Sequence, residues 1–288
     1  MPAPKFPPVR ACIFDMDGLL INTEDIYKQC ADNVLVRHGR PPLPWSIKAQ
    51  LMGVPGSSNG DVFHNWAQLP ISRDQFGHEQ SLEQEKLFAL CEPLPGAVRL
   101  LEALTGKRVN LDAPDDDHAP HKVGEPVVEV ALASSSESHN YTRKTVRANT
   151  QAFLNLIPVE RRVLADDERM KGAQGKPAPD IFLTALGAIN ETLPEGEEKI
   201  SPAECLVFED SVPGVEAGRR AGMRVVWVPH QDLKAHFAGR EEEVLAGRTG
   251  IVPVGREEQL GEVGDGWAEE IGSLEEFDYK KYGISVVS

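Results

Sequence analysis

The chain has 288 residues and is strongly acidic, with 30 Lys plus Arg against 45 Asp plus Glu and a formal net charge of −15. Such a protein repels a phosphate backbone, which argues against a nucleic-acid partner held on a basic face. The sequence has no apolar run long enough to span a membrane, and its first residues lack the apolar core of a signal peptide. We therefore expect a globular, monomeric protein of the cytoplasm with no membrane partner.

Short apolar runs with the composition of buried strands recur along the chain. Most do not alternate apolar with polar residues, which is typical of strands covered on both faces in a parallel sheet. Segments with apolar residues three and four positions apart separate them and indicate helices. This alternation predicts an α/β domain with a Rossmann-like, doubly wound parallel sheet. The expected strands are Val9–Phe14, Val127–Ala133, Arg161–Ala165, Cys205–Phe208 and Arg224–Val228, and the expected helices are Ala97–Leu104, Asp180–Ala188 and about Val215–Ala221.

The stretch from about residue 23 to residue 91 contains no convincing strand. Its helical segments are separated by Pro and Gly, so we expect an all-helical cap inserted into the α/β core. The predicted division is core 1–21, cap 22–94 and core 95–288. A polar stretch at 105–126 has the composition of a mobile surface loop. The expected cap helices are Asp25–His38, Ile47–Met52, Gly60–Trp66 and Gln80–Leu90.

Acidic and hydroxyl side chains follow several of the apolar runs. Asp15 and Asp17 follow the first run, Ser134 follows the second, and Glu209 and Asp210 follow the fourth. Because the carboxyl ends of parallel strands face one crevice, these residues are expected to meet there. Carboxylates so close together repel one another unless a cation lies among them. An all-oxygen set of ligands favours Mg²⁺.

Carboxylates with Mg²⁺ suggest phosphoryl chemistry. An ionised Asp can attack phosphorus directly to give an aspartyl-phosphate. A second acid must then protonate the leaving oxygen and later deprotonate the attacking water. Asp15 and Asp17 suit these roles because they are two positions apart, with the chain leaving the strand between them. Ser134 can donate its hydroxyl to phosphoryl oxygens, and Lys176 can supply a fixed positive charge.

Four segments of the chain resemble, in order, the four motifs of the haloacid dehalogenase superfamily. They are Asp15-Met-Asp-Gly, Ser134 after an apolar strand, Lys176 in a Gly-Lys-Pro-Ala-Pro-Asp segment, and Glu209-Asp210. The position of the helical insert is similar to the small cap of the subgroup that contains β-phosphoglucomutase and many sugar-phosphate phosphatases. Members of this subgroup more usually have an Asp at the position that Asn22 occupies in this chain.

The resemblance implies a role for each motif residue. It implies that Asp15 is the nucleophile, Asp17 the general acid/base, Ser134 a phosphate ligand and Lys176 the residue that steadies nucleophile and phosphate. It also implies that Asp210 binds Mg²⁺ together with Asp15 and the backbone carbonyl of Asp17, and that Glu209 supports this metal site. The residues expected at the substrate are Gly18, Ser135, Thr23, Gly53 and Ser57.

The implied substrate is a small phosphomonoester, a nucleotide or sugar phosphate, with pseudouridine 5′-phosphate as the first candidate. Closure of the cap over this substrate would exclude water during attack. Its expected hinges are the two crossings near Leu20–Thr23 and Glu92–Gly96.

Other activities on the same fold remain open alternatives. β-Phosphoglucomutases carry a His early in the first cap helix, where this chain has Tyr27, although Thr23 matches their hinge Thr. Enzymes that cleave carbon–halogen or phosphonate bonds lack an acid at the position of Asp17, which disfavours both. A non-catalytic relative that only binds ligand is the last alternative, although every motif residue is present.

Overall fold

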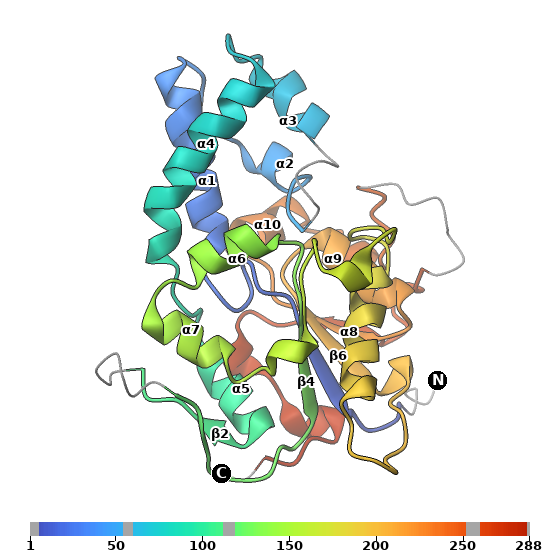
Figure 1. The fold of residues 1–288 in the computed structure, drawn as a ribbon. Coiled ribbons are helices and arrows are strands. Elements are labelled where there is room, and N and C mark those ends of the chain that lie inside the picture. The colour runs from blue at the N-terminus through green and yellow to red at the C-terminus, as the bar shows by residue number, and fades with distance from the viewer. Residues whose placement is uncertain (1–5, 54–59, 112–118, 252–259, 287–288) are drawn as a thin grey trace.

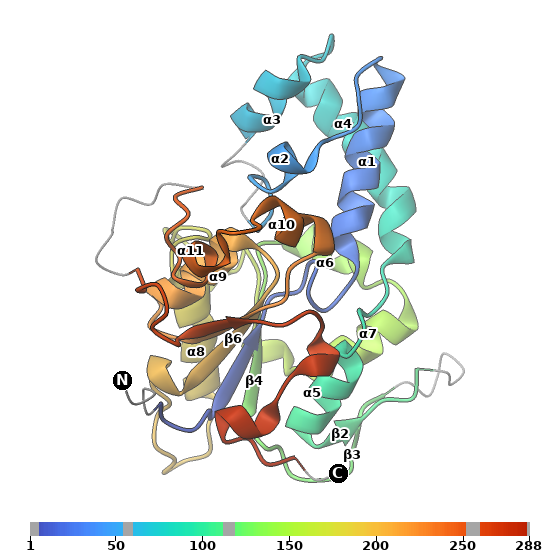
Figure 2. The same ribbon diagram turned by 180° about the vertical axis from the view of Figure 1, so that it is seen from behind.

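The computed structural model describes residues 6–53, 60–111, 119–251 and 260–286. At its centre lies one parallel sheet of six strands in the order β5-β4-β1-β6-β7-β8 (Figures 1 and 2). This sheet confirms the predicted α/β class and all five predicted strands. The strands are β1 Ala11–Phe14, β4 Glu129–Ala133, β5 Arg162–Val163, β6 Cys205–Glu209, β7 Arg224–Trp227 and β8 Ala268–Glu270.

The central strands are buried on both faces because successive side chains point to opposite sides of the sheet. Phe14 and Phe208 stack on one face at 4.7 Å between ring centroids, within a cluster that includes residues of α5 and α7. Ile13 and Val207 belong to the cluster on the other face, with residues of α8 to α11. These helices are α5 Ala97–Thr105, α7 Ala148–Leu154, α8 Asp180–Glu191, α9 Val212–Arg220, α10 Gln231–His236 and α11 Glu241–Leu245.

The register of the sheet brings the ends of neighbouring strands to one level. Phe14 of β1 pairs with Leu132 of β4 on one side and with Phe208 of β6 on the other. The backbone N–H of Asp15 continues this pattern and donates to the carbonyl of Phe208 at 3.0 Å. Residues that directly follow β1, β4 and β6 therefore share one edge of the sheet, as the sequence predicts.

A helical segment lies above this edge (Figure 1) and has its own hydrophobic cluster, which includes Val34, Phe63 and Phe76. Its all-helical character in the described residues agrees with the prediction, while the domain boundaries stay a prediction. One helix begins well before its expected start, because the Ser72 hydroxyl caps it by accepting from the N–H of Gln75 at 3.1 Å. The helices are α1 Thr23–Arg37, α2 Trp45–Lys48, α3 Gly60–Ala67, α4 Arg73–Leu87 and the 3-10 turn η1 Phe88–Leu90.

The two crossings between helical segment and sheet run side by side. The N–H of Asn22 donates to the carbonyl of Glu92 at 3.1 Å, and the side-chain oxygen of Asn22 accepts from the N–H of Glu92 at 2.8 Å. The N–H of Leu94 donates to the carbonyl of Leu20 at 2.9 Å. The amide oxygen of Asn22 thus makes the same kind of bond that a carboxylate could make there, which explains why Asn is tolerated.

Several elements were not expected from the sequence. In the polar stretch 105–126, where the sequence predicts a surface loop, the described residues form a short antiparallel hairpin that is largely exposed. Residues 112–118 lie outside the described chain. The edge strand β8 also went unrecognised, and so did several short helices. The remaining elements are β2 Lys107–Arg108, β3 His121–Lys122, α6 Ser138–Lys144, η2 Val159–Arg161, η3 Glu168–Met170, η4 Pro202–Glu204, η6 Leu274–Glu276 and η7 Tyr279–Tyr282. None of the helices in the described ranges has the length and apolar character that a membrane crossing requires.

Candidate active site

A buried lysine joins two of the predicted carboxylates. The side chain of Lys176 is fully buried, and its Nζ donates to Asp15 Oδ1 at 2.5 Å and to Glu209 Oε1 at 2.6 Å. It also donates to the carbonyl of Ala133 at the end of β4, at 3.1 Å. An ammonium group has three protons, so each of them has an acceptor. Lys176 is therefore fixed between β1, β4 and β6 and holds the carboxylate of Asp15 in place.

The acidic pair at the end of β6, Glu209 and Asp210, has two different environments. The second oxygen of Glu209 accepts from the N–H of Ser211 at 2.9 Å and from its hydroxyl at 3.0 Å. Both oxygens of Glu209 are thus engaged by the protein. Asp210 Oδ2, in contrast, is buried and has no hydrogen-bond partner among the described residues. Burial, together with the negative charges of Glu209, Glu24 and Asp15, raises the pKa of Asp210 well above its ordinary value.

A tight turn brings the backbone after Asp17 against Asp210. Gly18 adopts a positive φ of 78°, and its N–H donates to the carbonyl of Ile21 at 2.9 Å. A Cβ at this position would lie only 2.2 Å from Asp210 Oδ2 and 2.6 Å from Glu24 Cγ. Only glycine leaves room for the carboxylate of Asp210 here, and glycine alone adopts this φ at no steric cost.

These residues fit a Mg²⁺ ion. The unpaired, buried oxygen of Asp210 lacks a counter-charge, and burial, with Glu209 and Asp17 adding to the effect, raises the pKa of Asp15 to about 7 despite Lys176. A hard divalent cation would favour the ionised form of both carboxylates. The described residues contain no cluster of three or more His, Cys, Asp or Glu ligands. Two carboxylates with a backbone carbonyl and water are sufficient, because Mg²⁺ usually retains several waters.

Asp17 forms an ion pair with a different lysine, Lys144. Lys144 Nζ donates to Asp17 Oδ1 at 2.5 Å, and the Ser136 hydroxyl donates to Asp17 Oδ2 at 2.6 Å. The Ser134 hydroxyl lies 3.4 Å from the same Oδ2. Burial opposes ionisation of Asp17, but the charge and the hydrogen bond of Lys144 outweigh it, so the pKa of Asp17 is held below its ordinary value. The two aspartates of the first motif therefore have separate counter-charges.

The predicted substrate residues lie where the helical segment meets the sheet. The Ser135 hydroxyl donates to the carbonyl of Gly53 at 2.9 Å. Gly53 has a φ of 72°, and a Cβ there would lie 2.1 Å from Ser211 Oγ. Thr23 is fully buried at the start of α1, and Ser57 lies outside the described residues. Gly53 and Ser135 thus bring the helical segment into direct contact with the edge of the sheet that carries Asp15 and Asp210.

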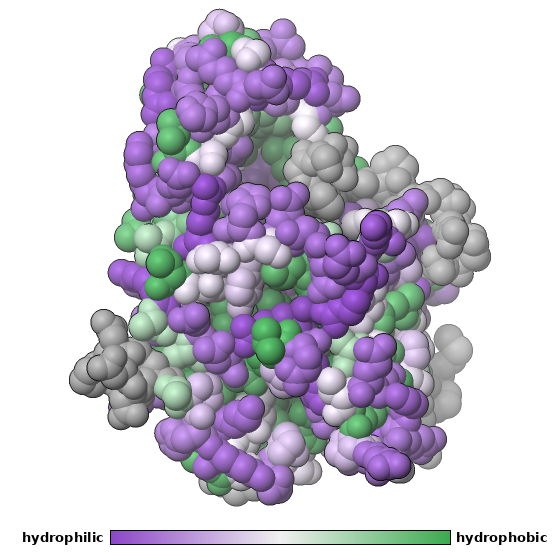
Figure 3. Space-filling model, in the orientation of Figure 1, coloured by the Kyte–Doolittle hydropathy of each residue, from purple (hydrophilic) through white to green (hydrophobic). Residues whose placement is uncertain are grey.

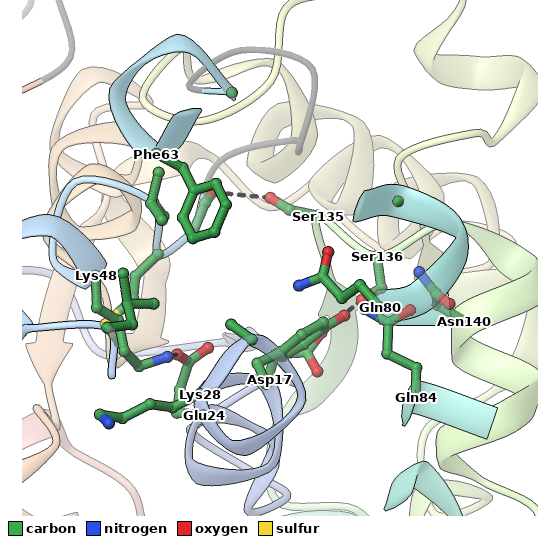
Figure 4. A pocket seen from close by; sticks show the side chains of 18 of the residues that line it. Asp17, Glu24, Lys28, Lys48, Phe63, Gln80, Gln84, Ser135, Ser136 and Asn140 are labelled. Carbon is green, nitrogen blue, oxygen red and sulfur yellow. Dashed lines mark hydrogen bonds and ion pairs between the residues drawn. The ribbon is translucent and has the colours of Figure 1, made fainter. Parts of the chain in front are cut away.

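A cavity of about 550 Å³ opens between the helical segment and the sheet, and both Asp15 and Asp17 line it. Figure 3 shows the molecule hollowed at this level, with hydrophobic residues visible inside the hollow. In Figure 4, Gln80 and Asn140 lie on the same side as Asp17, and Phe63 lies across the cavity from Gln80. Asp15 and Asp17 therefore line a cavity whose other walls come mainly from the helical segment.

Sequence reasoning missed two of the groups that contact the motif residues. Lys144 belongs to no motif, and it was not singled out even though it ends α6, the first helix after Ser134. Ser136 was not singled out either, although its hydroxyl donates to Asp17. A serine triplet after a buried strand, followed by a lysine at the end of the next helix, is the signal that could have found both.

Comparison with known proteins identifies the family. A model of the haloacid dehalogenase-like hydrolase family matches residues 9–222 of this chain. The chain therefore belongs to this family of hydrolases, and the resemblance inferred from the four motifs is confirmed.

Several individual relatives within this family have phosphatase names. A Saccharomyces cerevisiae protein named "Probable pseudouridine-5'-phosphatase" is 34% identical over 276 residues, which cover 96% of this chain and 98% of that protein. The Arabidopsis thaliana protein "(DL)-glycerol-3-phosphatase 1, mitochondrial" is 30% identical over 236 residues, covering 81% and 68% respectively. Among solved structures, a HAD hydrolase from Entamoeba histolytica (family IA, variant 3) superposes with a TM-score of 0.61 at 18% identity, covering 95% of this chain and 97% of that one. This last likeness shows the shared fold.

Replacing Gly18 by Ala should weaken Mg²⁺ binding, because the new Cβ must displace the carboxylate of Asp210. We expect a loss of affinity of roughly tenfold or more, as found when groups that orient a metal ligand are altered, measured by titration calorimetry. Gly39→Ala is the matched control, since Gly39 has a similar φ of 70° but nothing within 4 Å of the added Cβ. Equal Mg²⁺ affinity in Gly18→Ala and the wild type would contradict the assigned site.

Proposed function

We propose that this protein is a Mg²⁺-dependent phosphatase that hydrolyses a small phosphomonoester through an aspartyl-phosphate on Asp15. The observation that carries this proposal is the contact of Asp15 with the buried Lys176, beside an unpaired Asp210 oxygen. Lys176 stabilises the ionised, nucleophilic form of Asp15. Mg²⁺ bound by Asp15, Asp210 and the backbone carbonyl of Asp17 would supply positive charge that offsets the phosphoryl oxygens.

In the first step a carboxylate oxygen of Asp15 attacks phosphorus. A bond forms between this oxygen and phosphorus, and the bond from phosphorus to the leaving oxygen breaks. Asp17 gives a proton to the leaving oxygen, so the product departs as a neutral alcohol. Because Lys144 holds the pKa of Asp17 below its ordinary value, only the fraction of the enzyme in which Asp17 is protonated can take this step. Lys176 and the Ser134 hydroxyl offer positive charge and a hydrogen bond to the phosphoryl oxygens.

In the second step a water molecule attacks the same phosphorus. Asp17 is now a carboxylate and takes a proton from this water, while the bond between phosphorus and the Asp15 oxygen breaks. Inorganic phosphate leaves, and Asp15 is regenerated as a carboxylate. Asp17 thus serves as acid and then as base, which requires that its position be set independently of Asp15. Its own contact with Lys144 supports this.

For the substrate we propose a nucleotide or sugar phosphate, with pseudouridine 5′-phosphate first. The cavity of about 550 Å³ falls within the range of about 300–1,000 Å³ usual for small-molecule sites, which suits a leaving group larger than glycerol. The residues that line the cavity suit a substrate with a polar ring. Gln80 and Gln84 offer amide groups, and Phe63 offers an apolar face. The yeast relative's name points to the same substrate, whereas the Arabidopsis relative's name makes glycerol 3-phosphate the main competitor.

Phosphate release should require both Mg²⁺ and Asp15. We expect release from at least one phosphomonoester in a panel of pseudouridine 5′-phosphate, uridine 5′-phosphate, sugar phosphates and glycerol 3-phosphate, and its loss with a chelator. Asp15→Asn should lower kcat by about 10³-fold or more, because the nucleophile is removed. Asp74→Asn, at an exposed position in the first turn of α4, is the control and should leave kcat unchanged.

Full activity of Asp15→Asn, or no Mg²⁺-dependent release from any substrate, would contradict the proposal. Conversion of a sugar 1-phosphate into its 6-phosphate without free phosphate would instead indicate a phosphomutase.

The covalent intermediate can be trapped chemically. Borohydride reduces an acyl phosphate to an alcohol, so quenching the enzyme during turnover should convert Asp15 into homoserine. Peptide mass spectrometry should find this change only when substrate and Mg²⁺ are both present, and not at Asp17 in the same peptide. Normal phosphate release with unmodified Asp15 would show that water attacks the substrate directly.

A further inference from the structure

We propose that Lys144 is a positioning residue for Asp17, and that it fixes this carboxylate for proton transfer to the leaving group. The inference rests on the proposed function, in which Asp17 is the general acid/base. It adds a residue that belongs to none of the four motifs.

Lys144 and Ser136 hold both oxygens of Asp17. Lys144 Nζ donates to Asp17 Oδ1 at 2.5 Å and to Ser136 Oγ at 2.7 Å, and the Ser136 hydroxyl donates to Asp17 Oδ2 at 2.6 Å. The three side chains therefore form a closed ring of hydrogen bonds. A carboxylate bound at both oxygens cannot rotate about its terminal bond without breaking one of them, so its orientation is fixed.

The lysine is itself held by aromatic rings of the helical segment. Its Nζ lies 4.6 Å from the ring centroid of Tyr27 in α1 and 5.3 Å from that of Phe88 in η1. The two rings pack edge to face with centroids 5.0 Å apart. Aromatic faces attract a cation, so the rings favour one position of the ammonium group.

Stability alone does not account for Lys144. Its side chain is fully buried, and removing an ammonium group from water costs more than a single ion pair usually returns. Apolar residues of similar volume often replace such pairs without loss of stability. A buried lysine whose ion-pair partner is the proposed acid/base is therefore better explained by a role in the reaction.

The arrangement also separates the two aspartates of the first motif. Lys176 binds Asp15, and Lys144 binds Asp17. Each carboxylate therefore has its own counter-charge. With two lysines, each aspartate has its own orientation.

The test uses two substrates that differ in their need for a proton. The alkoxide leaving group of pseudouridine 5′-phosphate must be protonated, whereas 4-nitrophenolate leaves without a proton. Lys144→Met should lower kcat/KM for pseudouridine 5′-phosphate by about 100-fold, within the usual range for general acid catalysis. For 4-nitrophenyl phosphate we expect a loss of less than about fivefold, because the acid then contributes little. Ser136→Ala removes only a hydroxyl. It should cause a smaller loss of kcat/KM, again greater for pseudouridine 5′-phosphate than for 4-nitrophenyl phosphate.

A double-mutant cycle separates this role from a structural one. In Asp17→Asn, adding Lys144→Met should cost less than about twofold more, because residues that act as one unit are not additive. Arg220→Met is the control for loss of a buried ion pair, here with Glu216 at 2.7 Å. It should lower Tm but leave the ratio of the two kcat/KM values unchanged.

Equal losses on both substrates in Lys144→Met and Ser136→Ala, or additivity with Asp17→Asn, would overturn the inference. If Asp17→Asn itself affects both substrates equally, the acid/base role of Asp17 in the proposed function is wrong, and the inference fails with it. If the wild type hydrolyses neither substrate, the proposed substrate class fails as well.

Discussion

The crowding of buried carboxylates at one edge of the sheet is the constraint on which the rest of the structure depends. Asp15 directly follows β1, while Glu209 ends the adjacent strand β6 and Asp210 follows it, and the register of the two strands places these residues at one level. Like charges in a buried site cannot all remain ionised without compensation. Lys176 compensates Asp15 and Glu209, and Asp210 Oδ2 is left without a hydrogen-bond partner among the described residues. The sheet thus creates a site that needs one further cation, and this need links the fold to the chemistry.

The helical segment completes the site rather than merely covering it. Its rings, Tyr27 and Phe88, contact Lys144, and its Gly53 accepts a hydrogen bond from Ser135. The elements that form the substrate cavity are therefore also those that orient the proposed acid/base. A substrate that shifts the segment would change both the cavity and the environment of Asp17.

The central sheet and the core motif residues could be predicted from the sequence, because both depend on local signals. A buried parallel strand is a continuous apolar run, and the residue after it, such as Asp15, must lie at the sheet edge. Lys144 does not directly follow a buried strand but ends α6, so the strand-end signal does not single it out. The strand β8 was missed because Ala268–Glu270 is only partly buried and carries two glutamates. Cap residues at the substrate stay a prediction, since packing between two elements decides which of them face the cavity.

The most direct test of the need for a cation is the effect of Mg²⁺ on thermal unfolding of the wild type and of Asp210→Asn. Without Mg²⁺ the variant should unfold at a temperature equal to or above that of the wild type, because a neutral amide replaces a buried, unpaired carboxylate. Addition of Mg²⁺ should raise Tm of the wild type in a concentration-dependent way and leave the variant unchanged. A wild-type Tm that does not respond to Mg²⁺, or the same rise in Asp210→Asn, would contradict the account.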